Sequence, residues 1–172
     1  IQREAAIETL KEVEQYIGAK DGHHGHQTGK MIVAIFQHDC ARPDRTSGYA
    51  APDLHDHAFL MNMTKDENGR FRAVEIDTIY RVRAFATQLH WSKLVQKMQP
   101  LGYEFVFDAK TGAPELKGFT KEYLAENSKR RAEVLANEAR MKEEAARDGY
   151  TVEGNSLRGE AARRNRRSKH FD

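Results

Sequence analysis

Two helical patterns separated by strand-like segments constrain the fold of this chain more than any other feature. Apolar residues at helical spacing predict one helix over residues 3–17 and a second over residues 77–98, with Asp77 as its N-cap. Between the helices, the apolar run 31–36 and the segment 54–64 are predicted to be strands. Strands enclosed by helices in this order imply an antiparallel sheet with helices packed on it.

Turn and cap signals place the remaining elements. Asn68-Gly69 is a strong hairpin signal, after which residues 70–76 are expected to return antiparallel. A second hairpin is expected to pair residues 103–107 with residues 115–117. Thr120 is expected to cap a long helix that ends near Arg147. The predicted fold class is therefore α+β.

Length and composition set the general class of protein. A chain of 172 residues suits one domain, and we expect a domain over residues 1–147 followed by a basic tail over residues 148–172. The lone Cys40 excludes an internal disulfide, and no apolar run approaches a membrane span, so a cytoplasmic protein without a membrane partner is expected. Because the chain opens inside a helix and without Met, we expect further residues to precede Ile1 in the full protein.

The net charge of only +2 does not by itself indicate nucleic acid, but the distribution of charge is uneven. Six cations crowd the end of the chain: Arg158, Arg163, Arg164, Arg166, Arg167 and Lys169. Such a tail can contact phosphates. The competing interpretation, favoured by composition alone, is a solvated and frayed terminal helix.

Three histidines have the spacing of a metal site. His55 and His57 lie two apart in a predicted strand and therefore point to the same face, about 7 Å apart along the strand. His38 comes at the end of the preceding strand and can supply a third ligand from a neighbouring position. Three neutral imidazoles leave coordination positions open, which is typical of a catalytic rather than a structural site. The alternative is three unrelated polar residues near strand ends.

Other polar side chains leave alternatives open. His23, His24 and His26 cluster in a Gly-rich loop, where they can bind a second metal or simply be solvated. Arg70 and Arg72 alternate onto one face of a strand expected next to the histidine strand. Arginines there suit a phosphate track, and equally suit protection of a sheet edge by charge.

The order of motifs resembles a known family. Gln37-His38-Asp39-Cys40-Ala41-Arg42, followed by Ala51-Pro52-Asp53-Leu54-His55-Asp56-His57-Ala58, is similar to the three-histidine signature of conjugative relaxases of the MobF (TrwC/TraI) type, which are HUH endonucleases. The family pattern ends its histidine strand in an asparagine, here Asn62, and the likeness extends over roughly residues 3–135. It implies a palm-like HUH core and makes residues 1–147 a relaxase domain.

The resemblance also implies a reaction. A tyrosine of such an enzyme attacks one phosphate of single-stranded DNA at a transfer origin, forms a 5′-phosphotyrosyl link and frees a 3′-hydroxyl. His38, His55 and His57 carry over as ligands of a divalent metal ion, with Mn, Zn and Ni suited to imidazoles and Mg less so. Arg42 matches a position that can contact DNA. A downstream helicase domain or other relaxosome proteins are the further partners expected.

Two departures qualify the expectation of activity. The loop between His38 and His55 is longer than is usual in the family, and nothing in the chain matches the family's nucleophilic tyrosines, which lie upstream of the first helix. Tyr16 is expected to be a packing or surface residue, and Tyr49 is a remote candidate for a substitute nucleophile. The chain alone is thus expected to be inactive. The alternative function is a non-catalytic module that binds metal and single-stranded DNA.

Overall fold

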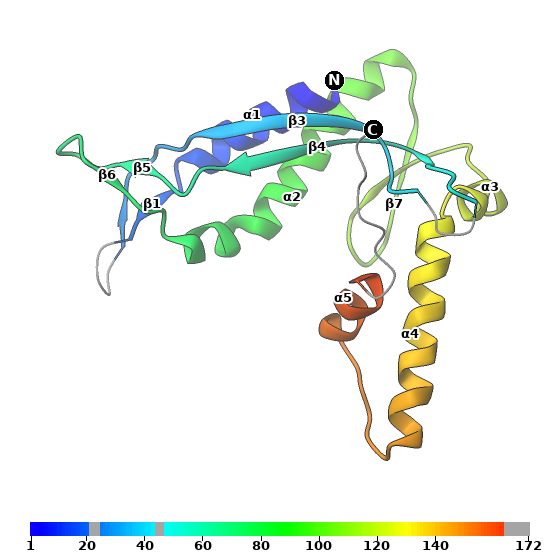
Figure 1. Cartoon of the computed structure of the whole chain (residues 1–172). Coiled ribbons are helices and arrows are strands. Elements are labelled where there is room, and N and C mark those ends of the chain that lie inside the picture. The colour runs from blue at the N-terminus through cyan, green and yellow to red at the C-terminus, as the bar shows by residue number, and fades with distance from the viewer. Residues whose placement is uncertain (21–24, 44–46, 164–172) are drawn as a thin grey trace. The chain divides into compact units, whose positions relative to one another are not determined.

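A computed structural model describes residues 1–20, 25–43 and 47–163 (Figure 1). Its internal contacts divide the chain into two units. Unit 1 comprises Ile1–His38 and Leu54–Gly118, and unit 2 comprises Asp39–Asp53 and Phe119–Asp172. The boundary proposed between residues 147 and 148 stays a prediction.

Two helices form the main packing of unit 1. Helix α1 (Gln2–Glu14) packs against α2 (Ile76–Met98). Its buried face carries Ala5, Thr9 and Val13, which recur every four residues and so lie on one side of the helix. Thr9 is accommodated there because its hydroxyl donates to the Ala5 carbonyl oxygen at 2.8 Å. The first helix is therefore confirmed, although it ends at Glu14, three residues earlier than predicted.

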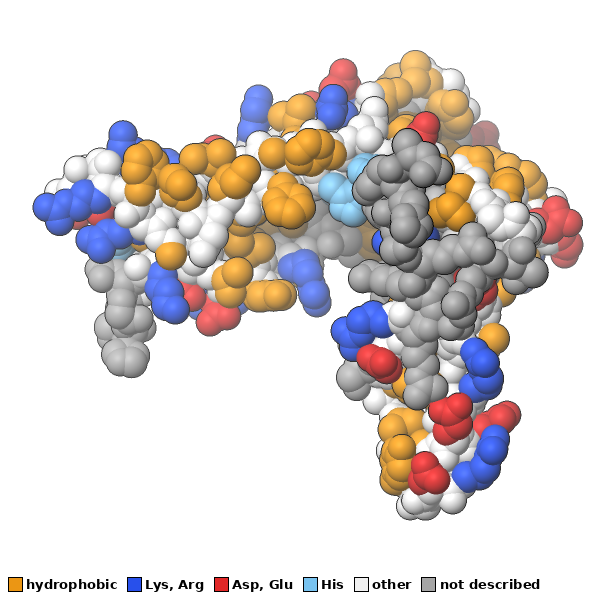
Figure 2. Space-filling model, viewed as in Figure 1, with side chains coloured by type: hydrophobic (Ala, Val, Ile, Leu, Met, Phe, Trp, Pro, Cys, Tyr) orange, Lys and Arg blue, Asp and Glu red, His pale blue; other side chains and the backbone are white. Residues whose placement is uncertain are grey.

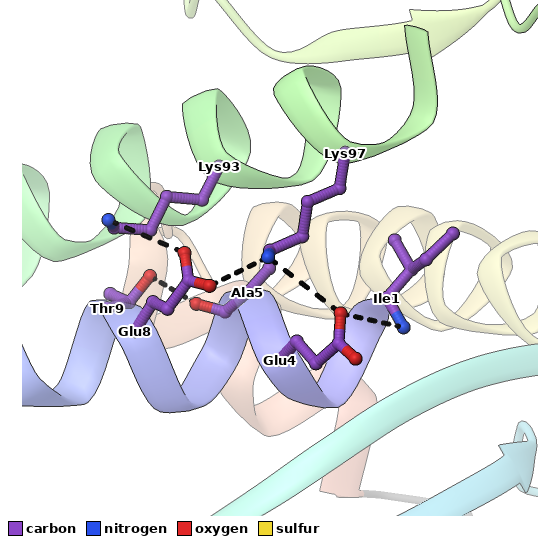
Figure 3. Close-up of polar contacts among 7 residues, drawn as sticks. All are labelled: Ile1, Glu4, Ala5, Glu8, Thr9, Lys93 and Lys97. Atoms are coloured by element: carbon purple, nitrogen blue, oxygen red, sulfur yellow. Dashed lines mark hydrogen bonds and ion pairs between the residues drawn. The ribbon is translucent and has the colours of Figure 1, made fainter. Parts of the chain in front are cut away.

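Ion pairs border the contact between α1 and α2 (Figure 3). Lys97 Nζ lies 2.7 Å from Glu8 Oε1 and 3.8 Å from Glu4 Oε2, and Lys93 Nζ lies 3.7 Å from Glu8 Oε2. The Lys97 ammonium holds the pKa of Glu8 below its ordinary value, and Glu8 in turn raises the pKa of Lys97. Lys93 and Lys97 therefore lie on the side of α2 that faces α1.

One long and three short antiparallel strand pairs accompany the helices within the described residues. β3 (Val33–Cys40) pairs with β4 (Pro52–Leu60), and the two run in opposite directions in Figure 1. β5 (Thr64–Lys65) pairs with β6 (Phe71–Arg72), β1 (Gly18–Ala19) with β2 (His26–Gln27), and β7 (Phe105–Phe107) with β8 (Pro114–Leu116). The α+β class and the antiparallel pairing are confirmed, although the strands within the described residues form four separate pairs.

The strand expected over residues 70–76 is much shorter than predicted. Only β6 pairs with β5, and α2 already begins at Ile76. The reason is that Val74 leaves the ladder: its N–H donates to Asn62 Oδ1 at 3.0 Å, and it forms an isolated bridge with Ala19. The predicted N-cap at Asp77 is also wrong, because the cap position is Glu75, in extended backbone conformation.

Helix ends elsewhere follow their capping residues. The 3₁₀ turn η1 (Gln99–Leu101) ends at Gly102, whose φ of 89° is left-handed and suits a residue without Cβ. Thr120 caps as predicted, its hydroxyl oxygen accepting from the Tyr123 N–H at 3.2 Å. The long helix expected after it is interrupted, since Asn127 Nδ2 donates to the Tyr123 carbonyl at 2.9 Å and the chain breaks into α3 (Lys121–Glu126) and α4 (Lys129–Arg147).

Unit 2 contains a packed helix where a solvated tail was favoured. α5 (Asn155–Arg163) contacts α4, and Leu157 and Ala161 are buried against it. Asn137 of α4 is buried as well and donates from Nδ2 to the Ala161 carbonyl at 3.2 Å. The interpretation as a frayed end is therefore wrong for residues 155–163, and residues 164–172 lie outside the described residues. No described helix has the length and apolar character needed to cross a membrane.

A turn after β5 gives a testable pH dependence. The Asp66 side chain is 3% exposed; it accepts the Arg70 N–H at 2.8 Å and faces the Arg72 Nε at 3.1 Å. The Arg70 N–H above all, with Arg72 in support, holds the pKa of Asp66 below its ordinary value of 3.8. Stability from this carboxylate is then fully present above that value and is lost as the pH falls through the lower folded-state pKa.

We expect Asp66→Asn to lower the urea midpoint of unit 1 near neutral pH, and the difference from wild type to shrink as the pH falls below about 4. The fluorescence of Trp91, the only tryptophan, reports the unfolding of α2 and hence of unit 1. Glu67→Gln is the matched control, because Glu67 is an exposed carboxylate in the same turn. A difference of equal size at neutral and at acid pH would contradict this account.

Candidate metal centre

Three histidines converge on one face of the β3–β4 pair. His38 lies within β3, and His55 and His57 lie two residues apart on β4, so strand alternation sends the latter two to the same face. Their ligand atoms all lie within 4.8 Å of one another. The ring centroids are 5.4 Å apart for His38 and His55, 4.8 Å for His38 and His57, and 5.1 Å for His55 and His57.

The arrangement fits a divalent metal ion. Within the described residues, these histidines form the only group of metal-ligating side chains of this kind. His38 and His55 are half-buried and His57 is exposed, so one side of the group stays open to a further ligand. Figure 2 shows histidine side chains gathered on the visible face, with hydrophobic side chains beside them. Imidazole donors suit Zn, Mn or Ni better than Mg.

The reverse face of the same strand carries a buried acid. Asp56 lies between the two histidines of β4 and points away from them, with its side chain only 4% exposed. Arg3 of α1 approaches it, with Nε 4.0 Å from Oδ1. The same guanidinium donates from an Nη atom to the Ile35 carbonyl oxygen of β3 at 3.2 Å. One arginine thus contacts both strands that hold the histidines.

The arginines singled out by sequence fall in both units, and within unit 1 the Arg70 N–H and the Arg72 guanidinium both contact Asp66. Arg42 is half-buried in unit 2, whereas Arg70 and Arg72 belong to unit 1. Arg72 lies in β6, which pairs with β5 rather than with the histidine strand, so the expected neighbouring strand was wrong. The Arg72 guanidinium also pairs with Asp66. Arg70 is exposed at the turn.

Other candidates occupy structural positions. Tyr16 packs edge-on against Phe85 with ring centroids 5.8 Å apart, as expected for a packing residue. The Tyr49 hydroxyl donates to Asn127 Oδ1 at 3.1 Å within unit 2. His26 lies in β2, while the predictions for His23 and His24 fall outside the described residues. Asn62, the asparagine that follows the histidine strand, accepts the Val74 N–H through Oδ1, and this bond takes Val74 out of the ladder that β6 forms with β5.

Comparison with known families decides the assignment. The family model of the TrwC relaxase matches residues 1–172, the whole chain. This chain belongs to the TrwC relaxase family. The relaxase-family chain is 27% identical over 124 residues to the multifunctional conjugation protein TraI of Escherichia coli K12, an alignment that covers 67% of this chain and 7% of TraI. This chain therefore spans only a small part of the length of the curated relatives that it matches.

Solved structures share the fold of this relaxase-family chain. TrwC complexed with a 27-mer DNA comprising the recognition hairpin and the cleavage site matches with a TM-score of 0.78 at 22% identity, covering 99% of this chain and 58% of that chain. A metal-bound TrwC complex with OriT DNA matches with a TM-score of 0.75 at 24% identity, covering 97% of this chain and 56% of that chain. The fold is that of a TrwC relaxase.

Proposed function

We propose that this chain is the metal- and DNA-binding part of a relaxase that nicks single-stranded DNA at a transfer origin during conjugation. The observation that carries the proposal is the group of His38, His55 and His57, whose ligand atoms lie within 4.8 Å on one strand pair of a TrwC-family chain. TrwC structures with OriT DNA, one of them metal-bound, support it. We place the activity in the cytoplasm, with a helicase domain or relaxosome proteins as further partners.

The three histidines of this chain would position the phosphate at which the DNA is cut. The three imidazoles would hold a divalent ion, which when bound withdraws charge from a phosphate oxygen. The open side at His57 leaves room for that phosphate beside the histidines. Attack by a tyrosine hydroxyl breaks the bond from phosphorus to the 3′-oxygen, which leaves as the 3′-hydroxyl, and forms the 5′-phosphotyrosyl bond. The sequence predicts that this tyrosine lies outside residues 1–172.

Arginines are proposed to hold the DNA backbone. Arg70 is exposed at the turn after β5 and has a guanidinium suited to phosphate oxygens. Arg72 is 39% exposed and keeps part of its guanidinium outside the pair with Asp66. Arg42 carries a third cation in unit 2. Contacts of this type set position and affinity rather than sequence preference.

The test is a cleavage assay on the full-length protein as it is encoded. It is mixed with a single-stranded oligonucleotide that spans the transfer origin of its own element, in the presence of Mn²⁺. We expect a 3′-hydroxyl fragment and a protein adduct on the 5′ fragment that persists in detergent gels, and the loss of both when a chelator removes the metal. Cleavage that is insensitive to the chelator would contradict a role for the histidine group.

Binding without cleavage would favour the second function. If the full-length protein binds both Mn²⁺ and the oligonucleotide, with affinity that falls as salt increases, yet forms no adduct, the chain is part of a non-catalytic metal- and DNA-binding module. One observation favours this alternative. Tyr16 and Tyr49, the two tyrosines considered as nucleophiles, instead make structural contacts with Phe85 and Asn127, respectively.

A further inference from the structure

Asp56 is a buried acid that the metal site does not use. Its side chain is 4% exposed, and neither carboxylate oxygen has a hydrogen-bond partner within the described residues. Taking a carboxylate out of water without compensation is costly, so such a group is kept only where a partner offsets the cost. Asp56 lies between His55 and His57 on β4, so a contact that fixes Asp56 also fixes the strand that carries both ligands.

Arg3 is the partner that the structure offers. Its Nε stands 4.0 Å from Asp56 Oδ1, which is an ionic contact without a hydrogen bond. An Nη atom of the same guanidinium is already fixed, because it donates to the Ile35 carbonyl oxygen at 3.2 Å. Ile35 lies on β3 three residues before His38, and Asp56 lies on β4. The planar fork of arginine suits this double contact, whereas a single ammonium provides only one point of charge.

We propose that Arg3 and Asp56 form a clamp behind the metal centre, which holds β3 against β4 so that His38 stays within ligand distance of His55 and His57. Both are positioning residues, since they act through the strands and touch neither the metal nor the DNA. The inference rests on the proposed metal site for its consequence. Partners that hold metal ligands in place typically change metal affinity about 10- to 100-fold when removed.

The ligand geometry explains why such a clamp matters. His55 and His57 share one strand, and the alternation of that strand alone fixes their relative positions. His38 stands on the other strand, so its distance to the pair depends on how β3 lies against β4. In the sequence, residues 41–51 separate the two strands, so the connection is longer than the tight turns that fix the register of a hairpin. The hydrogen-bonded ladder between β3 and β4 sets the register, and the contact from α1 to both strands adds a constraint to it.

The test compares Arg3→Met, Asp56→Asn and the double variant with wild type. Each is titrated with Mn²⁺ by calorimetry, and the amide hydrogen exchange of β3 and β4 is measured by NMR without metal. We expect each single variant to bind Mn²⁺ at least about 10-fold more weakly. The double variant should be no weaker than the weaker single one, because a clamp is lost once either half is removed. Exchange should quicken in β3 and β4 but not in α2.

Controls separate positioning from general loss of fold. Arg3 is half-exposed and Asp56→Asn preserves shape, so circular dichroism should show both variants folded. Lys11→Met removes another exposed cation of α1 and should change neither measurement. Additive losses of affinity in the double variant, or exchange rates in β3 and β4 equal to wild type, would overturn the clamp.

The outcomes distinguish the clamp from the metal site. If wild type binds Mn²⁺ and the clamp variants bind it equally well, the clamp is wrong and the proposed metal site stands. If wild type does not bind Mn²⁺, the proposed function is wrong, and the hydrogen exchange alone decides. Faster amide hydrogen exchange in β3 and β4 of the variants then shows that the clamp holds the strand pair together, although no metal binds there. Unchanged exchange refutes the clamp.

Discussion

Replacing His55 and His57 together by alanine is expected to abolish one-to-one binding of Mn²⁺ or Zn²⁺ to this chain. The change leaves His38 as the only imidazole of the group, and one imidazole cannot compete with water for a divalent ion at micromolar concentrations. Because losing a residue that only orients a ligand costs about 10- to 100-fold in affinity, losing two ligands should cost on the order of 1,000-fold or more. Isothermal titration calorimetry measures the change directly.

The fold should survive this double replacement, so the loss can be assigned to the site. His57 is exposed and His55 is half-buried, and neither belongs to the buried core. His26→Ala is the matched control, because His26 also lies on a strand but outside the group of three. Tight binding that persists in the double variant would show that the metal sits elsewhere and would remove the main support for the proposed function.

The part of the site that depends on strand periodicity could be predicted from sequence. A period of two places His55 and His57 on one face whatever the rest of the chain does, and the apolar run before His38 marks the strand that delivers it. The structure extends that strand through His38 to Cys40. What periodicity could not supply is the distance across the pair, since that distance depends on the register in which β3 and β4 pair.

Contacts between distant residues explain most of what the sequence left unpredicted. An Asp at the inward position of a strand was a usable signal, but nothing local connected Asp56 with Arg3, which lies 53 residues earlier in the chain. The short β6 has the same origin, because the loss of its ladder depends on Asn62 capturing the Val74 N–H. Likewise, the packing of α5 depends on contacts with the distant α4: Leu157 and Ala161 are buried, and the Asn137 amide donates to the Ala161 carbonyl.

The same distinction between local and distant contacts explains which helix ends were predicted correctly. Thr120 was predicted correctly because a cap needs only its own hydroxyl and an N–H three residues later. The N-cap of α2 was predicted at Asp77, two residues too late, because the start of α2 depends on where the preceding strand β6 ends. The break between α3 and α4 was missed because Asn127 is tolerated in a helix until its side chain captures a backbone carbonyl.

Ile17→Ala is expected to be the most destabilising single change in unit 1. Ile17 is 1% exposed and is the largest fully buried side chain in the described residues. Its carbonyl also accepts from the N–H groups of Thr28 and Gly29, at 2.8 Å and 3.0 Å, so the surrounding backbone is fixed and poorly able to collapse into a cavity. Truncating a buried isoleucine to alanine costs about 2–5 kcal/mol, and we expect about 3 kcal/mol here.

Urea denaturation followed by Trp91 fluorescence measures this loss, because Trp91 lies on α2 in unit 1. Ile7→Ala is the matched control: Ile7 is 37% exposed on α1, so the same truncation should cost less than about 1 kcal/mol. Similar losses for the two variants would mean that Ile17 does not anchor the core. Because unit 1 also carries the histidine group, a destabilised Ile17→Ala protein should still bind Mn²⁺ with wild-type affinity under conditions where it remains folded.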